Sequence, residues 1–204
     1  MDEPANPSPL NSDEEPSSDK GRKARKEPRK LRALSPEYFR RAALHYLDRY
    51  NGTSRSVRQL LQRRVTRARR EGQELDSQEI AGWIDALISD LQRLGLINDG
   101  NFAIGRARSL HASGQSLAMI RLKLQAKGIN SADIDAAIER LKDERGENLA
   151  LEAARTYVRK RRLGPYRPKD QRADKQDKDL AALARRGFSY DIATAALKGK
   201  DEEF

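Results

Sequence analysis

Cysteine is absent from this sequence, aromatic residues are scarce, and apolar residues never run for long. The lack of cysteine excludes a disulfide framework, a thiolate zinc site and a cysteine nucleophile. Aromatic residues make up 5% of the 204 residues, so a core must be built mainly from Leu, Ile, Val and Ala, which favours helices over strands. The apolar runs are far shorter than the roughly 18–20 residues that a membrane-spanning helix needs. We therefore expect no transmembrane segment and, because a cysteine-free chain fits a reducing compartment, a cytoplasmic protein.

Basic residues outnumber acidic residues by 41 to 31, which gives a formal net charge of +10. Residues 1–34 hold 7 acidic and 8 basic side chains, so about +9 belongs to the rest of the chain. A charge of this size indicates a polyanionic partner: nucleic acid, an anionic membrane surface or an acidic protein. The charge alone does not choose among these three.

The first 34 residues differ in composition from the rest. They hold five of the eight prolines and almost no large apolar side chain, so they cannot bury enough surface to offset the entropy lost on folding. An acidic segment precedes a basic one, and no apolar segment follows, which excludes a secretory signal. We expect a disordered tail over residues 1–34, with a nucleic-acid-binding arm as the alternative.

From residue 35 onward the apolar residues recur with helical spacing, and no stretch alternates as a half-buried strand would. Ser35 predicts the start of a helix that runs to about residue 50. The clearest helix covers about 78–94, with Trp83 in its apolar stripe and Gly95 as its stop. The same spacing predicts further helices at about 100–112, 116–127, 131–142, 148–162, 174–186 and 189–198.

These helices repeat. Residues 126–129 (Ala-Lys-Gly-Ile) match residues 185–188 (Arg-Arg-Gly-Phe), and each stretch is followed by a helix that contains Asp-Ile. A weaker copy precedes them, in which an Arg-rich insertion over about 65–79 replaces the glycine stop, and the last copy carries a basic loop over 163–177. Such tandem units cover one another's apolar faces. We expect an all-α fold of three-helix, helix-turn-helix-like repeats in an elongated, curved array, with units at 35–97, 98–145 and 146–204.

No arrangement of residues predicts catalysis. His45 and His111 each stand alone, which is typical of structural or surface histidines. Residues 95–100 have the glycine spacing of a phosphate-binding loop, but Asn101 and Phe102 occupy the positions that need Lys and Ser or Thr. We therefore expect no enzyme activity, no cofactor and no metal site.

Clusters of basic residues are the strongest functional signal. No acidic residue lies between residues 55 and 70, and the clusters fall at matching places in the repeats. Arginine predominates in the first cluster, which suits planar contacts with phosphate or carboxylate groups. The alternative for any one arginine is a solvated helix face. The candidate binding residues are Arg58, Arg63, Arg64, Arg67, Arg69, Arg70, Arg121, Lys123, Lys127, Arg159, Lys160, Arg161, Arg162, Arg185 and Arg186.

Three stretches give the sequence a family likeness over about residues 36–198. They are residues 94–103 (Leu-Gly-Leu-Ile-Asn-Asp-Gly-Asn-Phe-Ala), residues 114–129 (Gly-Gln-Ser through Ala-Lys-Gly-Ile) and residues 183–189 (Leu-Ala-Arg-Arg-Gly-Phe-Ser). Together with the three-unit layout, they make the chain resemble the RecX family of bacterial recombination regulators. The resemblance implies a basic, non-enzymatic protein that binds the RecA filament within its groove and depresses ATP hydrolysis and strand exchange.

The leading prediction is thus a RecA-filament modulator, acting as a monomer, that also meets single- or double-stranded DNA weakly or within the filament. A protein that binds DNA directly and without sequence preference is the alternative, because three-helix units resemble helix-turn-helix modules. Binding to an anionic membrane is disfavoured, because the apolar stripes are used by the core.

Overall fold

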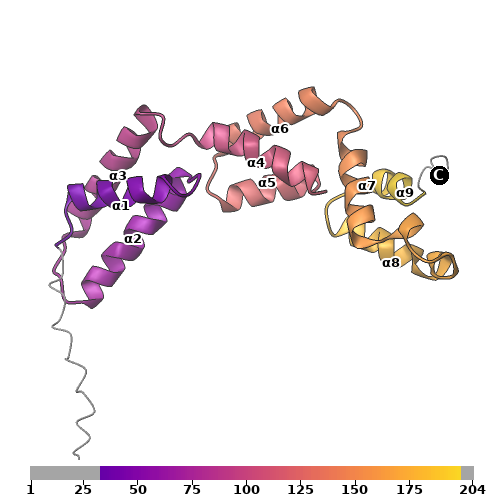
Figure 1. Cartoon of the computed structure of the whole chain (residues 1–204), viewed down its shortest axis with the longest axis horizontal. Helices are drawn as coiled ribbons and strands as arrows, with labels where there is room; N and C mark the ends of the chain where they lie inside the picture. The colour runs from indigo at the N-terminus through magenta and orange to yellow at the C-terminus, as the bar shows by residue number, and fades with distance from the viewer. Residues whose placement is uncertain (1–32, 199–204) are drawn as a thin grey trace, which may run out of the picture. The chain divides into compact units, whose positions relative to one another are not determined.

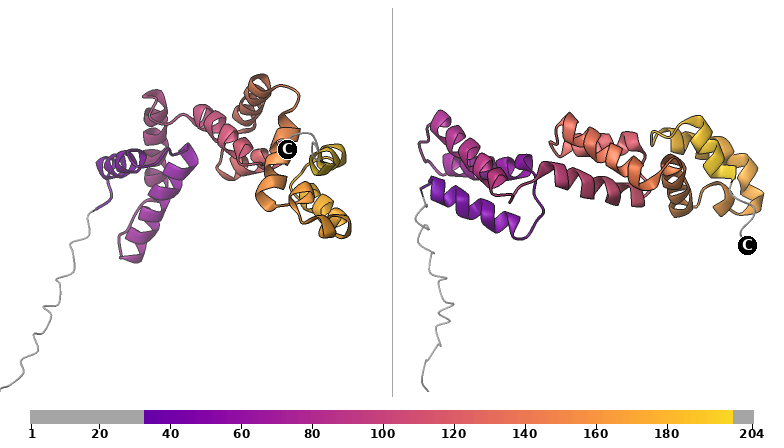
Figure 2. Two further views of the ribbon diagram at one scale, coloured as in Figure 1. Left: turned by 45° about the vertical axis from the view of Figure 1, so that its right-hand side comes forward. Right: turned by 90° about the horizontal axis from the view of Figure 1, so that it is seen from above.

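The computed structural model describes residues 33–198, and within that range every regular element is helical (Figure 1). The tail predicted over residues 1–34 lies almost wholly outside the described residues. Apolar side chains form three separate cores along the chain. We call the three groups of helices around these cores unit 1, unit 2 and unit 3; Figure 2 shows them from two further directions.

Three α-helices make up each unit. Unit 1 consists of α1 (Pro36–Leu47), α2 (Ser54–Arg70) and α3 (Ser77–Arg93); unit 2 of α4 (Asp99–Ala112), α5 (Leu117–Ala126) and α6 (Ser131–Arg145); and unit 3 of α7 (Leu149–Arg161), α8 (Arg172–Ala184) and α9 (Tyr190–Lys198), with the 3-10 turns η1 (Gly164–Tyr166) and η2 (Lys169–Gln171) between α7 and α8.

The cores explain why these residues are helical. Phe39 and Leu61 are fully buried in unit 1, Ile120 and Leu124 in unit 2, and Leu183 in unit 3. Apolar residues recur at helical spacing, which places one apolar stripe on each helix. Burying one side chain of this size contributes about 1.5–3 kcal/mol to the free energy of folding. The first residue of α7 also joins the core of unit 2, so that helix links two units.

Polar caps determine where most of these helices begin. Ser35, Asp76 and Asn98 each accept a hydrogen bond from a backbone N–H in the first turn of the helix that follows. Thr53 and Ser56 form a complete capping box at the start of α2. These caps satisfy N–H groups that have no partner within the helix.

The predicted all-α class, its three-helix repeats and the predicted helix positions are confirmed over residues 33–198, with two corrections of detail. The first helix ends at Leu47 rather than near residue 50. Trp83 packs at the edge of the first core rather than inside it, with its ring edge-on to Phe39 at 6.2 Å between centroids.

The prediction that an insertion replaces the first glycine stop is wrong. Helix α2 continues to Arg70, and Gly72 then adopts the left-handed backbone with φ of +86°. Val65 and Ala68 are buried, so the apolar stripe of α2 extends into these additional turns. The stop is therefore kept, and the helix before it is longer.

A repeated hydrogen bond joins each unit to the next, and we call the two places where these bonds form the first seam (units 1 and 2) and the second seam (units 2 and 3). At the first seam, the buried hydroxyl that caps α2 crosses to the end of α5: Thr53 Oγ1 donates to the carbonyl of Lys127 at 3.0 Å. At the second seam, the hydroxyl that caps α5 does the same at the end of α8, where Ser116 donates to the carbonyl of Arg186. The start of one unit's second helix thus meets the end of the next unit's second helix.

Both seams need a glycine at the same place. Gly128 and Gly187 follow the two acceptor carbonyls and have φ of +80° and +77°. A β-carbon on Gly128 would lie 2.2 Å from the Arg55 side chain, and one on Gly187 would lie 3.0 Å from the β-carbon of Ala118. The glycines that end α5 and α8 therefore also allow the neighbouring unit to approach.

The seam hydrogen bond can be tested by comparing two capping serines. Ser116→Ala removes both a cap and the bond to Arg186, whereas Ser35→Ala removes only a cap. We expect Ser116→Ala to lower the free energy of unfolding by about 2 kcal/mol and Ser35→Ala by about 1 kcal/mol. Urea titration of the full chain measures both values. Equal losses would show that the seam bond contributes nothing.

Candidate polyanion-binding surface

The second helices carry most of the candidate basic residues. The two seams connect the end of α8 to the start of α5 and the end of α5 to the start of α2. Lys127 and Arg186 occupy equivalent seam positions, as the repeat predicted. The cluster at residues 159–162 differs, because it lies at the end of α7, the first helix of unit 3.

Three of the candidate arginines form ion pairs with a carboxylate of their own unit. Arg58 bonds Asp85 at 2.5 Å and Arg121 bonds Asp135 at 2.6 Å, so in both units the fifth residue of the second helix is tied to the third helix. Arg67 bonds Glu71 at 2.8 Å. The hydrogen bond and charge of Glu71 raise the pKa of the Arg67 guanidinium above its ordinary value.

Three more candidates contact neutral groups, which orient the side chain, and none of the three has a carboxylate partner within residues 33–198. Arg64 donates to the Tyr38 hydroxyl at 2.9 Å and lies over the same ring. Arg69 donates to Ser77 at 2.7 Å, and Arg186 lies 5.6 Å from the centre of the Tyr157 ring. Such contacts hold a guanidinium at a fixed place without neutralising it.

The remaining candidates have no side-chain partner among residues 33–198, and all of them are at least partly exposed to solvent. This group spans α2, α5, the end of α7 and the end of α8. It consists of Arg63, Arg70, Lys123, Lys127, Arg159, Lys160, Arg161, Arg162 and Arg185.

The basic loop predicted over 163–177 uses its arginines internally. Arg167 makes two hydrogen bonds, of 2.7 and 2.8 Å, to the buried carboxylate of Asp179. Arg172 donates to the carbonyls of Pro165 and Arg167. These bonds hold the two 3-10 turns against α8. Sequence spacing did not reveal this pairing.

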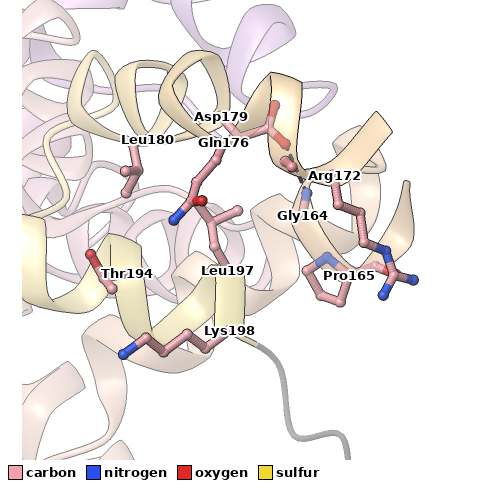
Figure 3. Close-up of a pocket in the computed structure, with 10 residues that line it drawn as sticks. Gly164, Pro165, Arg172, Gln176, Asp179, Leu180, Thr194, Leu197 and Lys198 are labelled. Atoms are coloured by element: carbon pink, nitrogen blue, oxygen red, sulfur yellow. Dashed lines mark hydrogen bonds between the residues drawn. The ribbon is translucent and has the colours of Figure 1, made fainter. Parts of the chain in front are cut away.

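Burial raises the pKa of the Asp179 carboxyl, but the hydrogen bonds from Arg167 and from the N–H of Gly164 outweigh that effect. The pKa of Asp179 therefore lies below its ordinary value. Figure 3 shows this carboxylate directed at Gly164 beside a cavity of about 260 Å³ between α8 and α9. Gln176 and Thr194 line this cavity.

No metal or membrane element is found in the described part of the chain. Among residues 33–198, no three His, Asp or Glu side chains gather where they could hold a metal ion. Every helix in that range is too short or too polar to span a bilayer. His111 is buried, and its Nε2 donates to the carbonyl of Leu149 at 2.8 Å, so it links α4 to α7.

Comparison with known proteins gives consistent matches. The model of the second three-helix domain of RecX matches residues 98–138. The regulatory protein RecX of Myxococcus xanthus (strain DK1622) is 39% identical over 178 residues, which is 86% of this chain and 92% of that protein. The chain belongs to the RecX family. The regulatory protein RecX of Halorhodospira halophila (strain DSM 244 / SL1) is 32% identical over 82% of this chain and 91% of its own length.

Solved RecX structures show the same fold. The crystal structure of RecX from Lactobacillus salivarius superposes with a TM-score of 0.57 at 26% identity and covers 80% of this chain and 94% of that chain. The stretch that matches the RecX second three-helix domain contains α4, α5 and the first half of α6. It includes the basic side chains Arg121, Lys123 and Lys127, so the stretch that matches this domain holds one of the clusters.

The buried ion pair of unit 3 predicts that the stability of this chain depends on pH. Because the pKa of Asp179 is lower in the folded state, the pair stabilises the fold above the ordinary carboxyl pKa of about 3.9. This stabilisation is lost as the pH falls through the lower, folded-state pKa. Asp179→Asn should lower the free energy of unfolding by about 2–3 kcal/mol at pH 7 and by less at acidic pH, where Asp179 of the wild type becomes protonated.

Urea titrations of wild type and Asp179→Asn at pH 7, 5 and 3 measure this difference, with Asp174→Asn, an exposed residue of the same helix, as the control. If the difference in free energy of unfolding between wild type and Asp179→Asn stayed constant across this range, the pKa of Asp179 would not be lowered in the folded state.

Proposed function

We propose that this chain regulates recombination by binding the RecA filament and slowing its ATP hydrolysis and strand exchange. The observation that supports the proposal is the set of cations on α2, α5, α7 and the end of α8 that lack a carboxylate partner within the described chain. A recombinase filament on DNA offers phosphates and acidic side chains to such a surface. The relatives are named regulatory proteins, which agrees with this role.

The backbone at Arg162 supports a binding role for the end of α7. Arg162 has φ of +51° and is the one residue other than glycine with positive φ among residues 33–198. Glycine ends α4, α5 and α8 in this same left-handed conformation, which costs a side-chain-bearing residue about 1–2 kcal/mol. A strained backbone at a cationic residue is consistent with a functional role for its side chain.

The regulator we propose is not an enzyme. It acts by binding, as a cytoplasmic monomer without a cofactor. The test is RecA's DNA-dependent ATPase measured with substoichiometric amounts of the full chain, together with co-sedimentation of the chain with filaments. We expect hydrolysis to fall and the chain to sediment with the filament. Unchanged hydrolysis without co-sedimentation would contradict the proposal.

Direct, sequence-nonspecific DNA binding is the second candidate function, favoured by the density of arginine on α2. It predicts an affinity for bare DNA that falls steeply with salt and does not depend on RecA. A titration against bare DNA, DNA-free RecA and RecA on DNA separates the two candidates.

The filament proposal can be tested with Lys123 and Lys127 at α5, two lysines without a side-chain partner among residues 33–198. Lys123→Gln/Lys127→Gln leaves the Arg121–Asp135 ion pair intact, so the packing of α5 on α6 is preserved. We expect the concentration that half-inhibits the RecA ATPase to rise about five- to tenfold. Arg106→Gln/Arg145→Gln, on α4 and α6, removes the same charge and is the matched control. Equal inhibition by the two variants would exclude α5 from the binding surface.

A further inference from the structure

The second helix of unit 1 is longer than its counterpart in unit 2. Helix α2 has 17 residues and α5 has 10, although each follows a capping hydroxyl and ends shortly before a left-handed glycine. The seven additional residues make about two turns, roughly 10 Å of helix. Nothing within 4 Å would contact a β-carbon on Gly72, so this end of α2 leads into open solvent.

Arginines surround the part of this extension that the core does not cover. At about 100° per residue, Arg63, Arg67 and Arg70 fall within roughly 60° of one another, on the side opposite Val65 and Ala68. Those two residues are buried, so the three arginines face away from the core of unit 1.

Two further arginines lie at the edges of this exposed face. Arg64 reaches Tyr38 on α1, and Arg69 reaches Ser77 on α3. Both partners are uncharged, so the flanks of the helix stay positive. The extension thus carries cations on its outer face and on both sides.

The extension has little negative charge to balance these cations. Helix α2 contains no acidic residue, and within residues 33–198 Glu71 is the one carboxylate bonded to residues 63–70. Arg63 and Arg70 have no side-chain partner among the described residues. Four of the five arginines between 63 and 70 therefore have no carboxylate partner in the part of the chain that the structure describes.

We propose that the end of α2 is a groove-binding element for duplex DNA, with the phosphates of both strands as its ligands. A helix with its side chains is about 10–12 Å wide, which fits a major groove of about 12 Å. The major groove has phosphates along both walls, so it can contact cations on both flanks of the helix. An acidic protein surface would contact only one face of the helix. This site would account for the DNA binding in the proposed function, and binding of duplex DNA at this site does not require RecA.

The test uses the full chain and a 30-base-pair duplex of mixed sequence, with affinity measured by fluorescence anisotropy between 50 and 200 mM salt. Arg63→Gln/Arg70→Gln removes the two unpartnered arginines, and Arg40→Gln/Arg41→Gln on α1 removes the same charge from another helix. If each lost arginine is one phosphate contact, the salt slope of the first variant falls by about 2. Its affinity deficit then shrinks roughly tenfold over this salt range, while the control stays near wild type.

Arg63→Lys/Arg70→Lys keeps the charge and should keep the slope, and helix content by circular dichroism should be unchanged in all variants. Equal slopes for the Gln variant and the control would overturn the proposal. So would a Gln variant that binds duplex normally but no longer inhibits RecA, because the end of α2 would then contact protein. If instead the slope falls as expected while wild type leaves RecA hydrolysis unchanged, the proposed function fails and the DNA site stands.

Discussion

The hydrogen bond from a helix-capping hydroxyl to a carbonyl just beyond the next unit's second helix is the contact on which the arrangement of the repeats depends. Thr53 and Ser116 each satisfy two needs, because the oxygen accepts from its own helix and donates across the seam. The geometry requires a small hydroxyl on one side and a glycine on the other. It also brings the negative end of one helix dipole to the positive end of another.

Ion pairs within the units divide the basic residues into two groups. Arg58 and Arg121 sit at the same place in their helices and hold the second helix to the third through a carboxylate. In unit 3, Arg167 bonds the buried carboxylate of Asp179 and thereby holds the turns before α8 against that helix. The candidate cations that form no ion pair within residues 33–198 make up the second group. They are the ones that we assign to a polyanionic partner.

Local signals in the sequence predicted most of the fold. Caps such as Ser35 and stops such as Gly95 act within a few residues, so they can be located without the structure. The seam bonds join residues 74 and 70 positions apart, and the Arg167–Asp179 pair depends on a loop fold with no periodic pattern. The clusters of candidate residues were therefore predictable, but which members are already paired was not. Gly72 was missed because the longer α2 moved the stop away from its expected position.

Chemical labelling of lysines on the full chain, with and without RecA filaments on single-stranded DNA, tests most directly whether the unpaired cations form the binding surface. Mass spectrometry of acetylated chains reports each lysine separately. We expect Lys123, Lys127 and Lys160 to be protected by the filament. Lys142, which bonds Glu139 on α6, should remain as reactive as in the free chain. Protection of Lys142 with full labelling of the other three would contradict the assignment of the binding surface.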